Sequence, residues 1–334
     1  MTQPIGAVAP ATEDAACTLC GGTRSTRMLA LSDAVWSRPG EFWLSRCEGC
    51  GAAFLSPRPP REGIGFYYKD LYRGDGLKFE EQLQYSGIAG VLNSRRLADL
   101  FSRRKPKPGE RHLDVGCGVG ALVVRTAKAT GATVAGVDFD PNAVATLSRK
   151  GAGLLVEAHE GILAQQVFLP GTFATVSMIH FLEHSYDPRG ELLLAHSLLE
   201  DGGAIVVEVP SDDSLARRVF GRYWFPHLAP QHLTLFSKVT LVRALQQAGF
   251  QDVRVKDAFA PLVWISSFVL AWHHTLGGKS AYAKNVFARV FTGLFALAFV
   301  VPMMIGDVLL AVLLPLAGRG DHIRATAVKR SQSS

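Results

Sequence analysis

Apolar and polar positions follow two alternating periods in the second half of the chain. From residue 111 onward, short apolar runs typical of buried strands are separated by segments whose apolar residues have helical spacing. Strands are predicted at about 111–115, 133–138, 153–157, 173–180, 203–209, 251–257 and 322–329. Helices are predicted at about 119–129, 141–149, 189–199 and 238–248. This order predicts an α/β fold, a seven-stranded, mostly parallel Rossmann-like sheet with helices on both faces.

The chain outside this pattern divides by composition. We expect a disordered tail, a cysteine-bearing module, an aromatic and helical connector, the α/β core, an apolar helical insertion, and a last strand with a tail. Their expected bounds are 1–16, 17–60, 61–104, 105–260, 261–317 and 318–334. The insertion thus falls before the last core strand.

Length and charge narrow the function classes. The 334 residues suit one full-sized domain with smaller attachments, and the formal net charge is +6. Basic residues are scattered without an aromatic-interleaved stripe, so we expect no nucleic-acid partner. An anionic membrane surface or a phosphate-bearing substrate fits the charge better. The first 16 residues contain two acids and no apolar run, which predicts a cytoplasmic chain without a secretory signal.

An apolar strand leads directly into a glycine-rich turn in Leu113-Asp114-Val115-Gly116-Cys117-Gly118-Val119-Gly120. Glycines permit the tight turn and let backbone N–H groups approach a ligand. The next apolar run ends in Asp138, which is placed to bind a ribose diol. We therefore expect a nucleoside-containing cofactor across this turn, with Cys117 packing in the loop rather than acting as a nucleophile.

The cofactor could be S-adenosylmethionine or a nicotinamide. Asp114 would attract the cationic amino group of S-adenosylmethionine but repel a pyrophosphate. The chain has no Tyr-x-x-x-Lys pair of the short-chain reductase kind. Gly116, Gly118 and Ala121 nevertheless satisfy the looser nicotinamide fingerprint. A nicotinamide-dependent reductase and a non-catalytic cofactor-binding scaffold therefore remain alternatives.

The glycine turn resembles the first motif of the class I S-adenosylmethionine-dependent methyltransferases. Gly136-Val137-Asp138-Phe139-Asp140-Pro141 resembles their second motif, and His180-Phe181-Leu182-Glu183-His184 resembles the post-strand motif of the ubiquinone-pathway O-methyltransferase branch. The resemblance implies methyl transfer from S-adenosylmethionine. It also implies a cofactor site made of Asp114, Gly116, Cys117, Gly118, Gly120, Asp138 and Phe139. Ala174 stands where many members have Asp, which weakens any expectation about how that strand is anchored.

Four cysteines form two C-x-x-C-G pairs, with 26 residues between Cys20 and Cys47. Thiolates of Cys17, Cys20, Cys47 and Cys50 can close tetrahedrally around Zn²⁺. Such a site has no open coordination position, so we expect the metal to be structural. The arrangement resembles the zinc-ribbon-fronted methyltransferases of sugar and natural-product pathways, which implies a small-molecule acceptor that is glycan-like or lipid-linked.

Acid–base candidates follow the predicted strand ends, where ligands bind in such folds. They are His180, Glu183, His184, His227 and His232. We expect His232 to be the base that activates a hydroxyl or carbon acceptor, with His184 as second choice. His180, Glu183 and His184 also resemble a Glu-x-x-Glu-His divalent-metal cluster of the ubiquinone-pathway branch, with His in place of the first Glu. A simpler alternative is that the cluster only packs against the cofactor.

Residues 290–317 are almost wholly apolar, with Asp307 the only charge. A single crossing would separate the last two strands of one sheet, so a hairpin that dips into one leaflet is expected, with Pro302, Gly306 and Asp307 near its middle. This predicts a protein peripheral to the inner face of the cytoplasmic membrane. A buried helical pair or an oligomer interface is the alternative.

Overall fold

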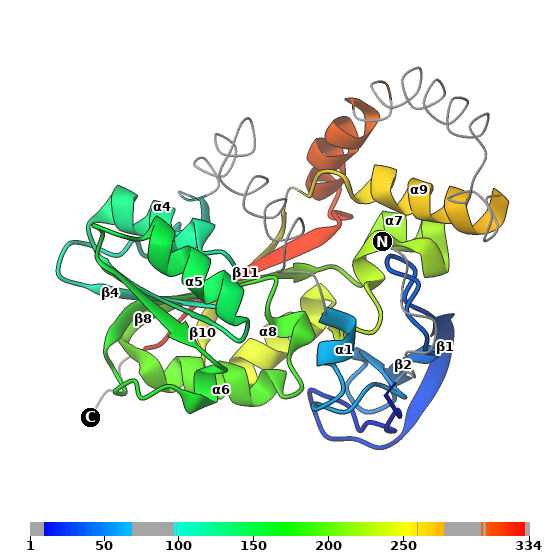
Figure 1. Ribbon diagram of the computed structural model, residues 1–334, viewed down its shortest axis with the longest axis horizontal. Coiled ribbons are helices and arrows are strands. Elements are labelled where there is room, and N and C mark those ends of the chain that lie inside the picture. Colours follow the sequence, from blue (N-terminus) through cyan, green and yellow to red (C-terminus); the bar gives the residue numbers. More distant parts are fainter. Residues whose placement is uncertain are drawn as a thin grey trace.

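Seven strands form one sheet in the order β10-β11-β8-β7-β4-β5-β6 (Figure 1). The computed structural model describes residues 10–68, 97, 99–258, 260–276, 302 and 305–330. The strands are β4 (Arg111–Val115), β5 (Thr133–Asp138), β6 (Val156–Glu160), β7 (Phe173–Ile179), β8 (Leu199–Pro210), β10 (Gln251–Ala258) and β11 (His322–Val328). Neighbours from β6 to β8 are parallel, and β11 is antiparallel to both β8 and β10. The predicted fold class is confirmed.

Two strands, β6 and β8, begin at other residues than predicted. β6 begins three residues later than expected, at Val156, because the preceding residues 151–154 form turns. β8 begins earlier, at Leu199, which pairs with Phe173 before the register shifts and Ala204 pairs with Thr175. Polar residues and glycines at the start of β8 hid this extension from the hydrophobic pattern.

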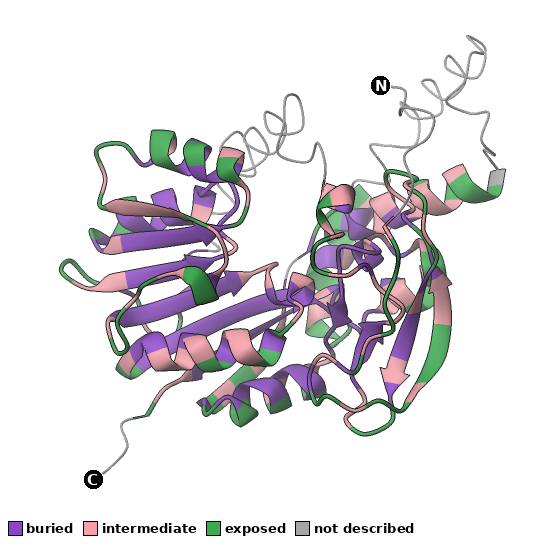
Figure 2. Cartoon of the chain, turned by 60° about the horizontal axis from the view of Figure 1, so that its bottom comes forward, coloured by how far each residue is buried: buried purple, intermediate pink, exposed green. Residues whose placement is uncertain are grey.

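Helices cover both faces of the sheet (Figure 2). The four that flank the core strands are α4 (Ala121–Thr130), α5 (Pro141–Lys150), α6 (Pro188–Leu198) and α8 (Lys238–Gln247). Side-chain N-caps stabilise the starts of three of these helices. Asp140, Asp187 and Ser237 accept hydrogen bonds from backbone N–H groups in the first turns of α5, α6 and α8. Their buried faces pack on the strands and leave polar faces outside.

The cysteine-bearing module is a second, four-stranded antiparallel sheet in the order β1-β2-β3-β9. Its strands are β1 (Ser25–Leu31), β2 (Phe42–Cys47), β3 (Ala53–Leu55) and β9 (Thr234–Leu235). β9 comes from the core, almost two hundred residues after β3. A short helix, α1 (Gly65–Tyr68), follows β3 and leads toward the core. The module is therefore joined to the core by strand pairing, because β9 of the core completes its sheet.

The apolar insertion contributes α9 (Val263–Leu276) and a helix over 305–316. These lie beside α7 (Leu215–Phe220), away from the outer strand β6 of the main sheet (Figure 1). The second helix is described from residue 305 and includes Gly306 and Asp307 in its first turn. The first half of the expected hairpin, 290–301, lies outside the described residues. Within the described residues, no helix is both long and apolar enough to cross a bilayer.

Candidate functional site

A cavity of about 370 Å³ opens at the carboxyl ends of β4, β5 and β7. This is the edge of a parallel sheet where neighbouring crossovers diverge and ligands bind. One side of the cavity belongs to the core and the other to α1 and the residues before it. Its walls include Gly116, Asp138, Phe139, Gly161, Ile162, His180, Phe181 and His184 from the core, and Arg61, Ile64 and Tyr68 from the module side.

The glycine turn forms a cradle that no larger residue could make. Gly116 and Gly120 have φ angles of 72° and 80°, which L residues with a side chain rarely adopt. A Cβ on Gly116 would lie 2.6 Å from the Phe181 ring, and a Cβ on Gly120 would lie 2.3 Å from Leu147. The turn therefore keeps its backbone close to the cavity, as binding of a nucleoside cofactor requires.

Asp138 lies in the cavity wall at the end of β5. Its carboxylate accepts hydrogen bonds from the backbone nitrogens of Gly118 (2.8 Å) and Asp140 (3.0 Å). These bonds fix the carboxylate between the glycine turn and the next helix. Burial raises its pKa, although both N–H groups oppose the shift. The position suits the ribose hydroxyls that the sequence pattern assigned to it.

Asp114 lies beneath the turn and is not part of the cavity wall. Burial raises its pKa to about 7, and the nearby Asp138 adds to the rise while a hydrogen bond from the Ser177 hydroxyl opposes it. Its charge therefore changes near neutral pH. Ser177 also contacts His112 Nε2 at 3.0 Å, and Thr175 contacts Nδ1 of the same ring at 2.8 Å. These contacts anchor β7 to β4 without an acid at position 174.

Glu183, His184 and His232 form a buried cluster beside the cavity, with one ligand atom of each within 4.8 Å of the others. The His184 and His232 rings are 4.5 Å apart. His184 Nδ1 lies 3.0 Å from the Gln231 carbonyl, and His232 Nδ1 lies 2.7 Å from the Pro226 carbonyl. A carbonyl can only accept, so Nδ1 of His232 carries the proton and its Nε2 keeps a lone pair. Nδ1 of His184 also lies 2.8 Å from the Tyr68 hydroxyl, which can donate to it or accept from it.

Charge in the cluster is concentrated on Glu183. Both carboxylate oxygens are buried and lack a hydrogen bond of normal geometry among the described residues, although Oε1 lies 3.4 Å from His180 Nδ1. Burial alone would raise the pKa of Glu183, but His180 and the neighbouring imidazoles hold it below its usual value. Burial lowers the pKa of His184, and burial together with His184 lowers the pKa of His232 to about 3. At neutral pH the cluster is therefore one carboxylate faced by neutral imidazoles.

His180 lies between two fully buried carboxylates. Its Nδ1 is 3.4 Å from Glu183 Oε1, and its Nε2 is 3.5 Å from Glu208 Oε1. The other oxygen of Glu208 pairs with the Arg324 guanidinium at 2.6 Å. His180 has a φ of 54°, so its backbone leaves β7 abruptly and its ring forms part of the cavity wall.

Three other residues named from the sequence, His227, His232 and Cys117, do not line the cavity. His227 Nε2 lies 3.1 Å from the Gly221 carbonyl and its ring packs on Trp224, away from the cluster. His232 lies behind His184 and is not among the residues that line the cavity. Cys117 is buried in the turn, with its thiol 3.6 Å from the Gly118 carbonyl.

Sequence reasoning did not single out Tyr68, whose hydroxyl lies 2.8 Å from His184 Nδ1 and whose ring contacts Phe139 edge to face. The aromatic run after the cysteine module was its only signal. Glu208 and Arg324 were also missed, because single polar residues within apolar strands give no periodic pattern.

The buried cluster fits a divalent cation. One ligand atom each of Glu183, His184 and His232 lies within 4.8 Å of the others, and Nδ1 of each imidazole is held by a backbone carbonyl, as is common in metal sites. The same groups could instead accept a proton. The geometry is compatible with both chemistries.

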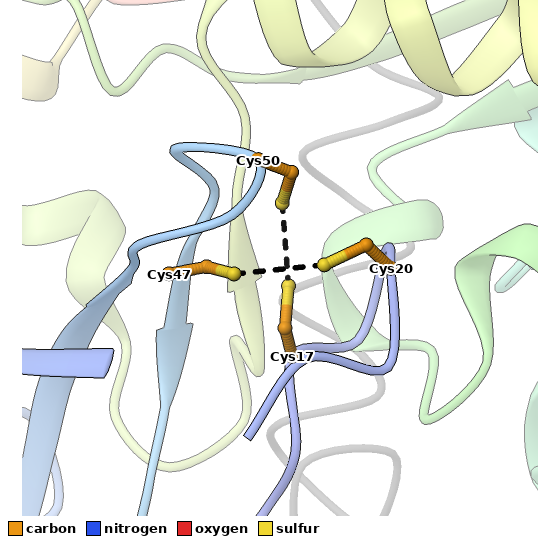
Figure 3. Close-up of side chains that lie close together, drawn as sticks. All are labelled: Cys17, Cys20, Cys47 and Cys50. Carbon is orange, nitrogen blue, oxygen red and sulfur yellow. Dashed lines mark hydrogen bonds between the residues drawn. The ribbon is translucent and has the colours of Figure 1, made fainter. Parts of the chain in front are cut away.

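The four module cysteines point toward a common centre (Figure 3). Sulfur atoms of Cys17 and Cys50, and of Cys20 and Cys47, are 3.5 Å apart. A tetrahedral zinc site with bonds near 2.3 Å places its sulfurs about 3.8 Å apart, so the arrangement fits the ion. Burial would raise the pKa of Cys47, but backbone N–H groups of Cys50 and Gly49 and the neighbouring thiols lower it to about 7, which favours a thiolate ligand.

Comparison with known proteins places the core in one family. Residues 86–255 match the model of the methyltransferase domain family. The chain is 34% identical over 173 residues to the ubiquinone biosynthesis O-methyltransferase of Xanthomonas euvesicatoria pv. vesicatoria, covering 48% of this chain and 70% of that protein. The corresponding enzyme of Ralstonia nicotianae is 31% identical over 167 residues, covering 48% of this chain and 67% of the relative.

A solved structure shares the fold. It is phosphoethanolamine N-methyltransferase 2 of Haemonchus contortus in complex with S-adenosyl-L-methionine, with a TM-score of 0.54 and 18% identity. The match covers 84% of this chain and 63% of the nematode protein, so the chain spans less than two thirds of that neighbour.

Proposed function

The chain belongs to the methyltransferase domain family, and from this premise we propose that it transfers a methyl group from S-adenosylmethionine to a hydroxyl or carbon of a glycan-like or lipid-linked small molecule. The family membership removes the reductase alternative. One observation supports the proposal that the acceptor binds next to the cofactor. The same cavity is bounded by the glycine turn with Asp138 on one side and by His184 with Tyr68 on the other.

In this proposal the two sides of the cavity have different tasks. Gly116, Asp138 and Phe139 hold the nucleoside end of the cofactor, whose sulfonium supplies an already activated methyl group. Arg61, Ile64, Tyr68 and Tyr186 enclose the acceptor. Alignment of the acceptor atom with the methyl carbon contributes most of the rate, and a base adds to it.

We propose that His184 takes the acceptor's proton. The acceptor oxygen or carbon forms a bond to the methyl carbon, the carbon–sulfur bond breaks with its electron pair left on sulfur, and the acceptor proton passes to the unprotonated ring nitrogen of His184. His184 is placed before His232, the first choice from sequence, because His184 lines the cavity and His232 lies behind it. His232 and Glu183 would stabilise the imidazolium that forms.

The test is a pair of variants. His184→Gln should lower kcat by about 100-fold or more, the usual contribution of a general base, while leaving the affinity for S-adenosylmethionine unchanged. His227→Gln is a matched control, because His227 is buried but away from the cluster. If His184→Gln keeps kcat within about threefold of wild type, the assignment is wrong.

The buried, negatively charged carboxylate of Glu183 supports a second candidate for the same site, a divalent cation held by Glu183, His184 and His232. A bound cation would act as a Lewis acid on the acceptor oxygen. The protein's part is to orient the ligands and exclude water. Dialysis against a chelator, followed by Mg²⁺ or Mn²⁺, separates the candidates: activity that is lost and then restored indicates the metal, and unchanged activity indicates the base.

Two further proposals concern the rest of the chain. A structural Zn²⁺ at the four cysteines is supported by their converging sulfurs. Peripheral attachment to the inner face of the cytoplasmic membrane is supported by the apolar composition of the insertion. Both are compatible with a lipid-linked acceptor.

A further inference from the structure

The outer surfaces of α9 and the 305–316 helix are apolar to an unusual degree. Nine large apolar side chains on or beside these helices are between 44% and 82% exposed. They are Leu262, Val269, Trp272, Ile305, Val308, Leu309, Val312, Leu313 and Leu316, and we call them the docking face. Single exposed apolar residues are normal, but a contiguous group marks a surface with a partner.

The two helices are held together by a buried acid. Asp307 Oδ1 accepts hydrogen bonds from the backbone nitrogens of Trp264 (2.9 Å) and Ile265 (3.1 Å), and Oδ2 accepts from Leu262. These N–H groups belong to the start of α9, where a negative charge is favoured. The only acid of the insertion is thus buried as a cap, and the apolar side chains remain exposed. The two helices that carry them lie next to each other (Figure 1).

The composition of this face suits lipid rather than protein. A protein–protein interface carries about one hydrogen bond per 100–200 Å². Over 262–272 and 305–317 the sequence has no Lys, Arg, Glu, Asn or Gln, and its one Asp is the buried cap. The docking face therefore offers a protein partner almost no hydrogen-bonding side chains, whereas acyl chains require none.

Polar and aromatic groups border the face as they do at membrane interfaces. Tyr223 stacks on His274 near the end of α9, with ring centroids 5.6 Å apart. Arg222 lines a surface cavity with these two residues, and Arg319 is exposed just after the second helix. Aromatic rings favour the headgroup level, and cations favour anionic headgroups.

We propose that the docking face inserts into one leaflet of an anionic bilayer and that the acceptor reaches the cavity from this lipid surface. The second part rests on the proposed methyl transfer to a lipid-linked acceptor.

α9 also contacts the loop that holds the catalytic cluster. The Ser267 hydroxyl on α9 accepts a hydrogen bond from the Phe225 backbone nitrogen at 2.9 Å. The next residue, Pro226, supplies the carbonyl that orients His232. Two hydrogen bonds, one between α9 and Phe225 and one between Pro226 and His232, therefore connect the helix that carries part of the docking face to His232 of the candidate cluster.

Flotation of the full chain on vesicles of phosphatidylglycerol and phosphatidylcholine in equal parts tests the proposal. Wild type should float, and the double variant Leu309→Glu with Leu313→Glu should lose at least roughly tenfold in partitioning, because two apolar anchors become charged. The matched control is Val167→Glu with Leu169→Glu, two side chains 97% and 69% exposed in a loop of the core. The control variant should float like wild type.

Calorimetric binding of S-adenosylmethionine, measured on all three proteins, separates this proposal from the proposed function and reports folding of the core. Unchanged cofactor binding with lost flotation supports the docking face. A double variant that still floats overturns it. So does a wild type that stays at the bottom of the gradient as a dimer that the same variant dissociates, since a second copy then covers the face. Flotation without cofactor binding contradicts only the methyl-transfer proposal.

Discussion

The backbone nitrogen of Leu233 donates a hydrogen bond to the carbonyl of Glu183 at 2.8 Å, while the Leu233 carbonyl accepts one from Leu55 of the cysteine module at 2.9 Å. Leu233 thus joins β3 of the module to the segment that carries Glu183 of the candidate cluster. Thr18, inside the first cysteine pair, reinforces the connection with a 2.8 Å contact to Thr234. The module therefore supports the candidate site although its cysteines lie outside the cavity.

We predict that the protein binds one Zn²⁺ ion per chain and that its removal also impairs the core site. A closed four-thiolate site contributes folding energy to its module, and β3 loses its order without it. Elemental analysis gives the stoichiometry, and calorimetry before and after chelation gives the cofactor affinity. Wild type carried through the same dialysis without the chelator is the matched control. A reduced, well-folded sample free of metal would remove the zinc assignment.

Asp138→Ala should weaken S-adenosylmethionine binding by about 1–3 kcal/mol, the loss expected when a charged hydrogen-bond acceptor is removed. The variant also releases the Gly118 nitrogen that Asp138 holds at 2.8 Å. Asp201→Ala, an exposed acid of the core, serves as the control. Equal affinities of Asp138→Ala and wild type in calorimetry would show that Asp138 does not contact the ribose.

The affinity for S-adenosylmethionine should rise severalfold as the pH increases from 6 to 7.5. Asp114 has a raised pKa of about 7, and the cationic amino group of the cofactor favours the ionised carboxylate. Binding therefore releases a proton and tightens as the pH passes through the pKa of Asp114. Asp114→Asn should remove this slope, and Asp201→Asn should retain it. A slope that survives in Asp114→Asn would assign it to another group.

Asp307→Ala should destabilise the protein by about 1–3 kcal/mol, because three N–H groups at the start of α9 lose a charged acceptor. Thermal unfolding followed by circular dichroism measures the loss against Asp201→Ala. Cofactor affinity should change little, since Asp307 lies outside the cavity wall. An unchanged melting temperature would mean that Asp307 does not hold the two helices together.

The sheet could be predicted from sequence because strands such as β5, β7 and the second half of β8 are short apolar runs and β10 and β11 alternate apolar with polar residues. The glycine turn and Asp138 follow directly from the strand ends. β9 could not be predicted, because two residues give no pattern and its partner strand is distant in sequence. The role of Asp307 was hidden for a related reason, since a lone acid in an apolar run acquires its partners only through tertiary contacts. His227 was named as a site candidate because it is close to His232 in sequence. In the structure the two rings have different hydrogen-bond partners and do not form one cluster.

Methyl transfer itself is tested most directly by incubating the purified protein with S-adenosylmethionine labelled in its methyl group and an extract of lipids and glycans, followed by mass spectrometry of the products. Wild type should transfer the label to a component of the extract and release S-adenosylhomocysteine. Asp138→Ala should transfer far less at the same cofactor concentration. Tight binding of NADH without binding of S-adenosylmethionine, or bound S-adenosylmethionine whose label never leaves it, would contradict the account.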